Sequence, residues 1–410
     1  MVDPPLPTDM LIEVLIRLQV KSILKFRCVC KTWCDLIRSP VFIQGHQKRE
    51  RKQKVLLVKR YLPSQNGDEE VFSFSHNSTV PGLRMRILSH SLPPRNGEGE
   101  TFSFHDPDFP EVLVSPNLPI PILNDLNIPW YRRSDIPIHG PCNGLVCIAF
   151  EKTVFLCNPA LREFKLLPPP RFPVGYIVRP FKYGFGFDPL TGAYKVIHIS
   201  DMRKEHYEEF WYNLGMISIR IDMYNSATDS WKQIHDVKVP PGGYLPGYEL
   251  FYNGAIHWAV IAPNTSSSIL CFNVSTDTFR QIDFHDNFSP LERDLKLMEL
   301  NDSLSVVRYS NLMTGQCNTE IWVMKEYGVK ESWTKQFVIG PYCVICPFLF
   351  LKNELLLVES ANGQLATCAL HENQFKGFQF YGSRRSTSAV LYEESLINLN
   401  QIIASDRRDE

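Results

Sequence analysis

The sequence predicts an α+β multidomain chain, in which a small N-terminal three-helix unit precedes an all-β propeller of five to seven blades. Three observations lead to this prediction. The first forty or so residues contain three short apolar segments at helical spacing, with almost no connecting loop. Beyond residue 54 the chain changes to short strand-like runs separated by segments rich in Pro, Gly, Asn and Asp. From residue 141 onward these runs recur with a period of about 50 residues, which is typical of propeller blades.

Each of the three expected helices has a polar residue near its start. Thr8 can cap the first helix, Ser22 the second, and Thr32 is expected to open the third. The third helix should stop near Ser39 and Pro40, because proline disfavours helix in the residue before it. The segment contains more Leu, Ile, Val and Phe than three short helices can bury among themselves. The surplus is therefore expected either to bind a partner or to pack on the rest of the chain.

Charge is divided unevenly along the chain. Residues 1–60 contain 13 Lys and Arg against 5 Asp and Glu, a net of +8, whereas the remainder contains 30 against 39, a net of −9. The basic run KRERKQK at residues 48–54 is interpreted as a solvated linker helix, with a nuclear-targeting or nucleic-acid patch as the alternative. The acidic remainder would favour encounter with a basic partner, although net charge does not locate a patch.

Two kinds of half-repeat predict β-hairpins. In the first kind, Asn followed by Gly, Asp or Glu opens a strand, at Asn143, Asn253, Asn301 and Asn353. In the second kind, an aromatic follows a turn that contains Asn, at Asn158 and Phe164, Asn225 and Trp231, Asn273 and Phe279, and at Trp333 after a longer turn. The Asn, Asp and Gly positions accept the positive backbone angles of tight turns, and the aromatic is expected to cover the hairpin.

The spacing of these half-repeats indicates a kelch-like propeller with four strands per blade. The intervals between the first-kind Asn residues are 110, 48 and 52 residues, so that the longest corresponds to two periods. An irregular β-sandwich is the alternative, but a sandwich does not require a constant repeat.

The sequence contains no recognisable catalytic or metal-binding constellation. It lacks a Gly-x-Ser-x-Gly elbow, a His-Glu-x-x-His helix and a phosphate-binding loop. Cys343 and Cys346, with Cys368 and His371, have the pair spacing of a zinc site, but strand alternation would send the members of each pair to opposite faces. We therefore predict no metal and no cofactor. The remaining cysteines are expected to be reduced and buried, including three in the helical unit, Cys28, Cys30 and Cys34.

The N-terminal segment resembles the F-box, the adaptor-docking module of cullin-based ubiquitin ligases. The resemblance is carried by Leu6-Pro7, Leu15, Arg17-Leu18, Lys21-Ser22, Phe26 to Lys31, Trp33, Leu36-Ile37 and Ser39-Pro40. Gln19 departs from the family, which usually has proline there. The resemblance implies that eight residues face a Skp-type adaptor: Leu6, Pro7, Leu11, Leu15, Leu18, Ile23, Leu24 and Trp33.

The rest of the chain resembles the F-box-associated domain of plant F-box proteins. Four strings carry this likeness: GPCNGLVCI from residue 140, LCNPALREFKLLP from 156, YGFGFDPLTGAYKVI from 183 and IWVMKEYGVKESWTK from 321. The last two, with VLYEESLINL from residue 390, are most similar to S-locus F-box proteins, the pollen-side factors of self-incompatibility. The expected domains are an F-box at 1–47, a basic linker at 48–54, a propeller at 55–400 and a polar tail at 401–410.

Together these resemblances imply a non-catalytic substrate-recognition subunit of a Skp–cullin–F-box ubiquitin ligase. Its partners would be a Skp-type adaptor, through it the cullin and RING subunits, and a protein client, with a basic non-self S-RNase as the candidate. A receptor of the same architecture for a defence or developmental client is the first alternative, and a propeller enzyme or sugar-binding lectin is the second. We expect a cytoplasmic protein, with the nucleus as an alternative, and no binding to nucleic acid or membrane. The client could contact an acidic loop that contains Asp201, Glu205, Glu208 and Glu209.

Overall fold

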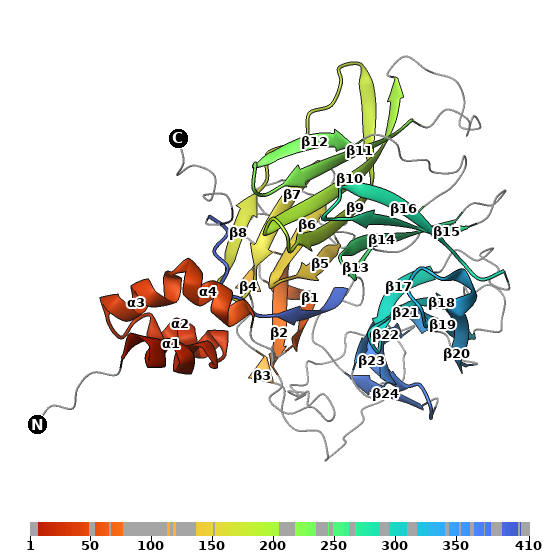
Figure 1. Cartoon of the computed structure of the whole chain (residues 1–410). Helices are drawn as coiled ribbons and strands as arrows, with labels where there is room; N and C mark the ends of the chain where they lie inside the picture. The colour runs from red at the N-terminus through yellow and green to blue at the C-terminus, as the bar shows by residue number, and fades with distance from the viewer. Residues whose placement is uncertain are drawn as a thin grey trace, which may run out of the picture.

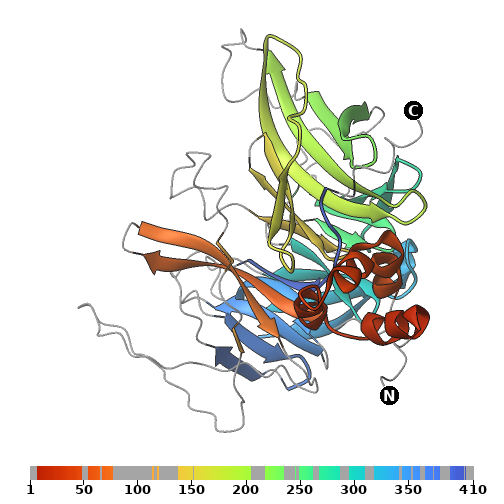
Figure 2. The ribbon, with the colours of Figure 1, turned by 90° about the vertical axis from the view of Figure 1, so that its left-hand side faces the viewer.

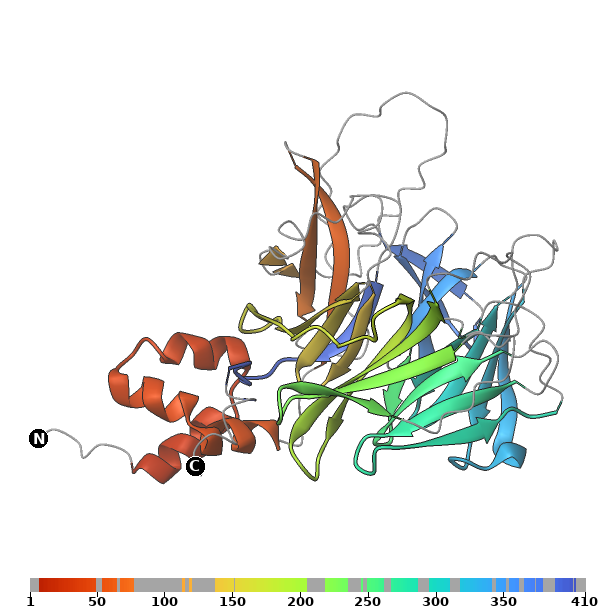
Figure 3. The ribbon, with the colours of Figure 1, turned by 90° about the horizontal axis from the view of Figure 1, so that it is seen from above.

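The structure is a computed structural model, and it describes most of the helical unit and of the strands. The described residues are 7–48, 54–64, 67–76, 113–114, 118–119, 137–150, 152–204, 218–234, 245, 249–261, 267–286, 295–309, 318–340, 344–351, 354–360, 365–372, 374–378, 388–400 and 402. Figure 1 shows the helices grouped at one side of the sheets, and Figure 3 shows the same separation from above. Figure 2 looks from the side on which the helices lie, with the sheets behind them.

The helical unit contains four helices among the described residues rather than the three that the sequence predicts. They are α1 (Thr8–Ile16), α2 (Val20–Phe26), α3 (Lys31–Arg38) and α4 (Pro40–Gln47). Helix α3 ends at Arg38 as predicted, but Ser39 then caps α4, because its Oγ accepts a hydrogen bond from the Phe42 N–H at 3.3 Å. Pro40 occupies the first position of α4, where its fixed φ and missing N–H are tolerated. The same proline therefore ends one helix and begins the next.

The first helix begins at its predicted cap, and the second and third begin before theirs. The residues that precede these three helices are Pro7, Gln19 and Cys30, and none of these makes a side-chain capping hydrogen bond. The predicted caps Thr8, Ser22 and Thr32 all lie inside the helices. The capping predictions were wrong because an extended residue alone is enough to start a helix when tertiary packing supports it.

Among the described residues, five antiparallel sheets of four strands form blades of a β-propeller, which confirms the predicted fold class. The first two blades contain β5 (Ile138–Cys142), β6 (Leu145–Phe150), β7 (Thr153–Asn158) and β8 (Glu163–Leu166), then β9 (Tyr176–Asp188), β10 (Ala193–Lys204), β11 (Ser218–Asn225) and β12 (Ser230–Ile234). The third and fourth contain β13 (Leu250–Tyr252), β14 (Ala255–Val260), β15 (Ser268–Asn273) and β16 (Thr278–Asp283), then β17 (Leu295–Leu300), β18 (Ser303–Tyr309), β19 (Thr319–Met324) and β20 (Trp333–Ile339). The fifth contains β21 (Val344–Leu351), β22 (Leu355–Ser360), β23 (Leu365–Ala369) and β24 (Gln374–Phe378).

A sixth sheet pairs the last described strand with the first and closes the ring. It pairs β25 (Ser388–Glu393) with β1 (Lys54–Ser64), and β1 with β2 (Gly67–His76), to which β3 (Leu113–Val114) and β4 (Leu118–Pro119) also pair. The first strands of the blades contact one another in sequence order, and β25 contacts both β21 and β5. The C-terminal strand therefore completes a circle that would otherwise be open. The predicted linker at 48–54 lies almost entirely outside the described residues.

The predicted equivalence of the hairpin aromatics is confirmed by the strand register. Each of these aromatics pairs with the last residue, or the last but one, of the preceding strand. The pairs are Phe164 with Cys157, Trp231 with Tyr224, Phe279 with Phe272, and Trp333 with Met324. The indole N–H of Trp231 donates to the Pro168 carbonyl oxygen at 2.6 Å, and that of Trp333 to the Asp283 carbonyl oxygen at 3.2 Å. Each of these carbonyls lies at or just after the last strand of the preceding blade. Equivalent aromatics therefore also link neighbouring blades.

Only the first kind of half-repeat has the predicted backbone angles at its Asn. The φ angles of Asn143, Asn253 and Asn301 are 45°, 48° and 48°. In the second kind, the positive φ instead falls four residues after the Asn, at Arg162, Asp229 and Asp277. The Asn itself forms an Asx turn, in which its Oδ1 accepts a hydrogen bond from a backbone N–H two residues later, as in Asn225 with Ala227 at 2.9 Å.

A buried lysine connects the second blade to the third. The Nζ of Lys195 lies 2.7 Å from Oδ1 of Asp277 and 3.5 Å from Oδ2 of Asp188, and it also donates to the Val274 carbonyl oxygen. Burial alone would raise the pKa of both carboxyls, but their hydrogen bonds and the Lys195 charge outweigh burial and lower both pKa values. Both carboxylates are thus held ionised against the lysine.

Replacement of Lys195 by Met should lower the free energy of unfolding by about 2 kcal/mol, because charged hydrogen bonds are lost and two carboxylates remain. The depressed pKa values also give a pH dependence. The contribution of Asp188 and Asp277 is complete above their ordinary pKa of 3.8 and is lost as the pH falls through their folded-state values. Urea unfolding at several acidic pH values measures the effect. The free energy of unfolding should fall more steeply with decreasing pH for wild type than for Lys195→Met, and equal slopes for the two proteins would contradict this account.

Candidate partner-binding sites

An apolar patch lies exposed on the first helix. Met10 and Val14 are each 58% exposed and lie one turn apart, on the same face of α1. Pro7, which precedes the helix, is also exposed, and Leu11 is half-buried beside them. We call Pro7, Met10, Leu11 and Val14 the α1 patch. Large apolar side chains that remain exposed side by side in so small a unit indicate a surface that a partner covers.

The structure separates the eight predicted adaptor-facing residues into two groups. Leu15 and Ile23 are buried, with 2% and 0% exposure, and belong to the core of the helical unit. Those with exposed surface are Pro7, Leu11, Leu18, Leu24 and Trp33, whereas Leu6 lies outside the described residues. A part of the predicted set is thus accessible, and adaptor contact by these residues remains a proposal. Met10 and Val14 are absent from the predicted set, because helical spacing alone does not tell which apolar face is covered.

The last segment of the chain connects the helical unit to the first blade. The carboxylate of Glu163, in β8, accepts a hydrogen bond from the Leu399 N–H at 3.1 Å and from Nδ2 of Asn398 at 3.4 Å. Burial lowers the pKa of Arg27, which also interacts electrostatically with Glu163, and burial raises the pKa of Glu394. Leu396, Ile397 and Leu399 belong to the same apolar cluster as the core of the helices. We call residues 394–400 the C-terminal segment; it fixes the position of the helical unit on the propeller.

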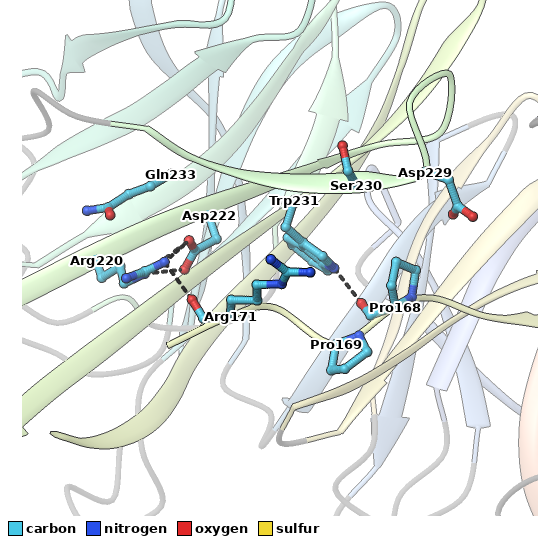
Figure 4. A pocket seen from close by; sticks show the side chains of 9 residues that line it. All are labelled: Pro168, Pro169, Arg171, Arg220, Asp222, Asp229, Ser230, Trp231 and Gln233. Atoms are coloured by element: carbon cyan, nitrogen blue, oxygen red, sulfur yellow. Dashed lines mark hydrogen bonds and ion pairs between the residues drawn. The ribbon is translucent and has the colours of Figure 1, made fainter. Parts of the chain in front are cut away.

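A pocket of about 350 Å³ lies between the first and second blades (Figure 4). Strands β11 and β12 and the turn between them supply one side of it, and the connection from β8 to β9 supplies the other. Its lining residues are Pro168, Pro169, Arg171, Arg220, Asp222, Asp229, Ser230, Trp231 and Gln233. The pocket therefore combines an aromatic ring, prolines and charged groups.

Two of the four charged side chains that line this pocket are paired with each other, and a third is hydrogen-bonded to a tyrosine. Arg220 binds Asp222 through two nitrogens, with Nε at 2.8 Å from Oδ2 and Nη2 at 2.7 Å from Oδ1. The Nη2 of Arg220 also donates to the Arg171 carbonyl oxygen at 2.9 Å. Asp229 accepts a hydrogen bond from the Tyr224 hydroxyl at 2.7 Å. Charge pairing thus holds the walls of the pocket in place.

A buried histidine lies behind the pocket. His198 stacks on Tyr183 with ring centroids 4.7 Å apart and has Phe172 and Trp231 at its edges. Burial, together with the nearby cation of Arg220, lowers the pKa of His198 to about 4. The histidine is therefore neutral at physiological pH and adds no charge to this region.

The other sequence-based site candidates are placed only in part. Asp201 lies in β10 with its side chain outside the described part, and Glu205, Glu208 and Glu209 lie wholly outside it. The predicted burial of three cysteines was wrong, since Cys28 and Cys30 are exposed and Cys34 is half-buried. They lie at the turn after α2 and at the outer side of α3, whereas Ile37 and Phe42 fill the core.

The structure also places two members of the predicted zinc-like set. Cys368 is buried as a free thiol, and His371 is exposed and paired with Glu354. Within the described ranges, no group of three or more His, Cys, Asp or Glu side chains could hold a metal ion. None of the helices that the structure describes is long and apolar enough to cross a membrane.

The structure thus combines a small helical unit that has an exposed apolar patch with a propeller that has a pocket between its first two blades. Residues 5–44 match the F-box domain, and residues 117–399 match the F-box associated beta propeller domain. The chain belongs to this family of F-box proteins.

Two relatives from Arabidopsis thaliana are similar to most of the chain. An F-box/kelch-repeat protein of this plant is 25% identical over 87% of this chain and 86% of its own length. The F-box protein CPR1 is 22% identical over 96% of this chain and 88% of its own. Among solved structures, TolB from Acinetobacter baumannii matches with a TM-score of 0.44 and 9% identity, over 82% of this chain and 66% of TolB.

Proposed function

We propose that this F-box protein is the substrate-recognition subunit of a Skp–cullin–F-box ubiquitin ligase. The observation that carries the proposal is the match of residues 5–44 to the F-box domain, on the same helices that expose the α1 patch. In this function the protein is a non-catalytic adaptor. The F-box binds a Skp-type adaptor, which links it to the cullin and RING subunits, and the propeller binds the client. Rate enhancement comes from holding client lysines near a ubiquitin thioester on another subunit.

The test is reconstitution of the complex from purified parts. The full chain is mixed with a Skp-type adaptor and a cullin–RING assembly and analysed by size-exclusion chromatography. We expect one complex that contains all the components, and a chain that does not co-elute with the adaptor would contradict the proposed function.

For the client, we propose a basic ribonuclease of the self-incompatibility type, a non-self S-RNase. Two observations support this: the strings from residues 183, 321 and 390 that resemble S-locus F-box proteins, and the net charge of −9 beyond residue 60. Pollen-restricted transcription linked to a ribonuclease locus would agree with it, and leaf expression would count against it.

The association rate with a panel of basic ribonucleases should fall as ionic strength rises, since salt screens attraction beyond about 10 Å at 0.1 M. Glu208→Lys with Glu209→Lys should slow association at low salt. Stopped-flow measurements across salt concentrations test this, and a rate independent of salt, or no binding to any ribonuclease, would exclude this client.

A further inference from the structure

We propose that the pocket between the first two blades binds an acidic, extended segment of the client. A carboxylate of that segment pairs with Arg171, and an adjacent apolar side chain packs against Trp231 and Pro168. The inference rests on the proposed function of the chain as a receptor for protein clients, and it does not depend on the client being a ribonuclease.

Charge gives the first argument. Arg220 and Asp222 neutralise each other, and Asp229 is bonded to Tyr224 and lies 3.9 Å from the Lys165 Nζ. Arg171 is exposed and has no carboxylate partner among the described residues. The charge left available in the pocket is therefore positive, opposite in sign to the net charge of the chain beyond residue 60. An unpaired guanidinium at the rim favours a carboxylate, with which it forms charge-assisted hydrogen bonds.

A second cation lies close to this region. The Lys152 Nζ lies 5.2 Å from the centroid of the Phe172 ring, on which the Arg220 guanidinium also lies, at 5.5 Å. Lys152 is exposed and has no carboxylate partner in the part of the chain that the structure describes. Its charge adds to that of Arg171, whereas His198 behind the pocket is neutral. The electrostatic field at the pocket therefore attracts an acidic segment more strongly than Arg171 alone would.

The apolar wall gives the second argument. The Trp231 indole is held by its 2.6 Å hydrogen bond to the Pro168 carbonyl oxygen, and the adjacent prolines restrict the backbone of that connection. Figure 4 shows the Trp231 indole facing Pro168 and Pro169, with the Arg171 guanidinium close to it. A wall that is already ordered loses little conformational entropy when an apolar side chain packs on it.

The shape of the site points to an extended chain. A volume of about 350 Å³ lies at the lower end of the range for ligand sites, roughly 300–1,000 Å³, so it accommodates side chains and not a folded domain. Ser230, Trp231 and Gln233 come from β12, the outermost strand of its blade, whose outer edge pairs with none of the described strands. Gln233 lies on the same face of β12 as Trp231, is exposed, and offers an amide to the backbone of a bound segment.

The test uses a library of random dodecapeptides displayed on phage, selected against the immobilised full chain. Enriched peptides should contain Asp or Glu next to apolar residues. Synthetic copies should bind Arg171→Glu about tenfold more weakly than wild type, or worse, as expected for loss of a charged hydrogen bond. The matched control is Lys325→Glu, which makes the same charge change at an exposed residue of the fourth blade.

A double-mutant cycle makes the assignment specific. Replacing the peptide carboxylate by its amide should weaken binding to wild type but not weaken it further on Arg171→Glu. No enriched peptide, enrichment of basic peptides, or equal binding to Arg171→Glu would overturn the inference. The Arg171→Glu chain should still co-elute with the Skp-type adaptor, so failure of the peptide experiment leaves the receptor function intact. Failure of wild type to bind the adaptor would instead count against the proposed function.

Discussion

Replacement of Met10 and Val14 by Asp should abolish co-elution of the chain with a Skp-type adaptor. Both side chains are 58% exposed, so the free energy of unfolding should change little. If the adaptor covers the α1 patch, two apolar contacts are lost and two carboxylates are buried without partners. Together these effects cost at least about 4 kcal/mol, or a roughly thousandfold loss of affinity. Size-exclusion chromatography and calorimetric titration with the adaptor measure the effect.

The matched control is the double variant Val174→Asp, Leu190→Asp. These two side chains are 99% and 81% exposed in the propeller connections, and their replacement should leave adaptor affinity unchanged. Leu15→Ala is a poorer test, because Leu15 is buried and its truncation would destabilise the helices by roughly 2–5 kcal/mol. Full adaptor affinity in the Met10, Val14 variant would show that docking uses another face.

Replacement of Asn158 by Ala should lower the free energy of unfolding by about 3–5 kcal/mol. This side chain is fully buried at the end of β7. Its Nδ2 donates to the Ile397 carbonyl oxygen at 2.7 Å, and its Oδ1 accepts from the Tyr392 hydroxyl at 3.1 Å and the Ala160 N–H at 3.1 Å. Alanine removes these bonds and leaves the Ile397 carbonyl oxygen without this donor, whereas the Tyr392 hydroxyl keeps its bond to Gly144 and the Ala160 N–H keeps its bond to Tyr392. Urea unfolding of wild type and of Asn158→Ala measures the difference in the free energy of unfolding.

Asn225→Ala is the matched control, because Asn225 occupies the same repeat position in the second blade. Its Oδ1 accepts one turn hydrogen bond, from Ala227, and the residue is only half-buried. Its replacement should cost about 1 kcal/mol, as for an ordinary hydrogen bond. Equal losses for the two variants would mean that the bonds from Asn158 to the C-terminal segment contribute little.

The Asn158 variant also bears on function. The C-terminal segment that Asn158 holds also packs against the helical unit, so loosening it frees the adaptor-binding end to move relative to the propeller. Ubiquitin transfer depends on that geometry, since client lysines must stay near the thioester. We therefore expect slower transfer by Asn158→Ala even at temperatures where the chain remains folded.

Local spacing was enough to predict the propeller. The recurrence of Asn143, Asn253 and Asn301 predicted the inner hairpins, because a tight turn needs positive φ at positions that Asn and Gly tolerate. The turns that precede the aromatics Trp231 and Trp333 predicted further hairpins for the same reason. The helical unit could be predicted for a related reason, since its helices are short and contiguous in sequence, whereas the F-box itself was indicated by a family resemblance. In each case the physical cause acts over a few neighbouring residues.

Tertiary packing decided the rest. The sequence could not distinguish buried Leu15 from exposed Val14 on one apolar helix, because the covered face depends on what packs against it. The pocket brings Arg171 beside Arg220, 49 residues further along the chain. Asn158 meets Ile397 across 239 residues. The first contact depends on the packing of neighbouring blades and the second on the return of the chain to the first blade after β25, and neither is encoded by a local pattern.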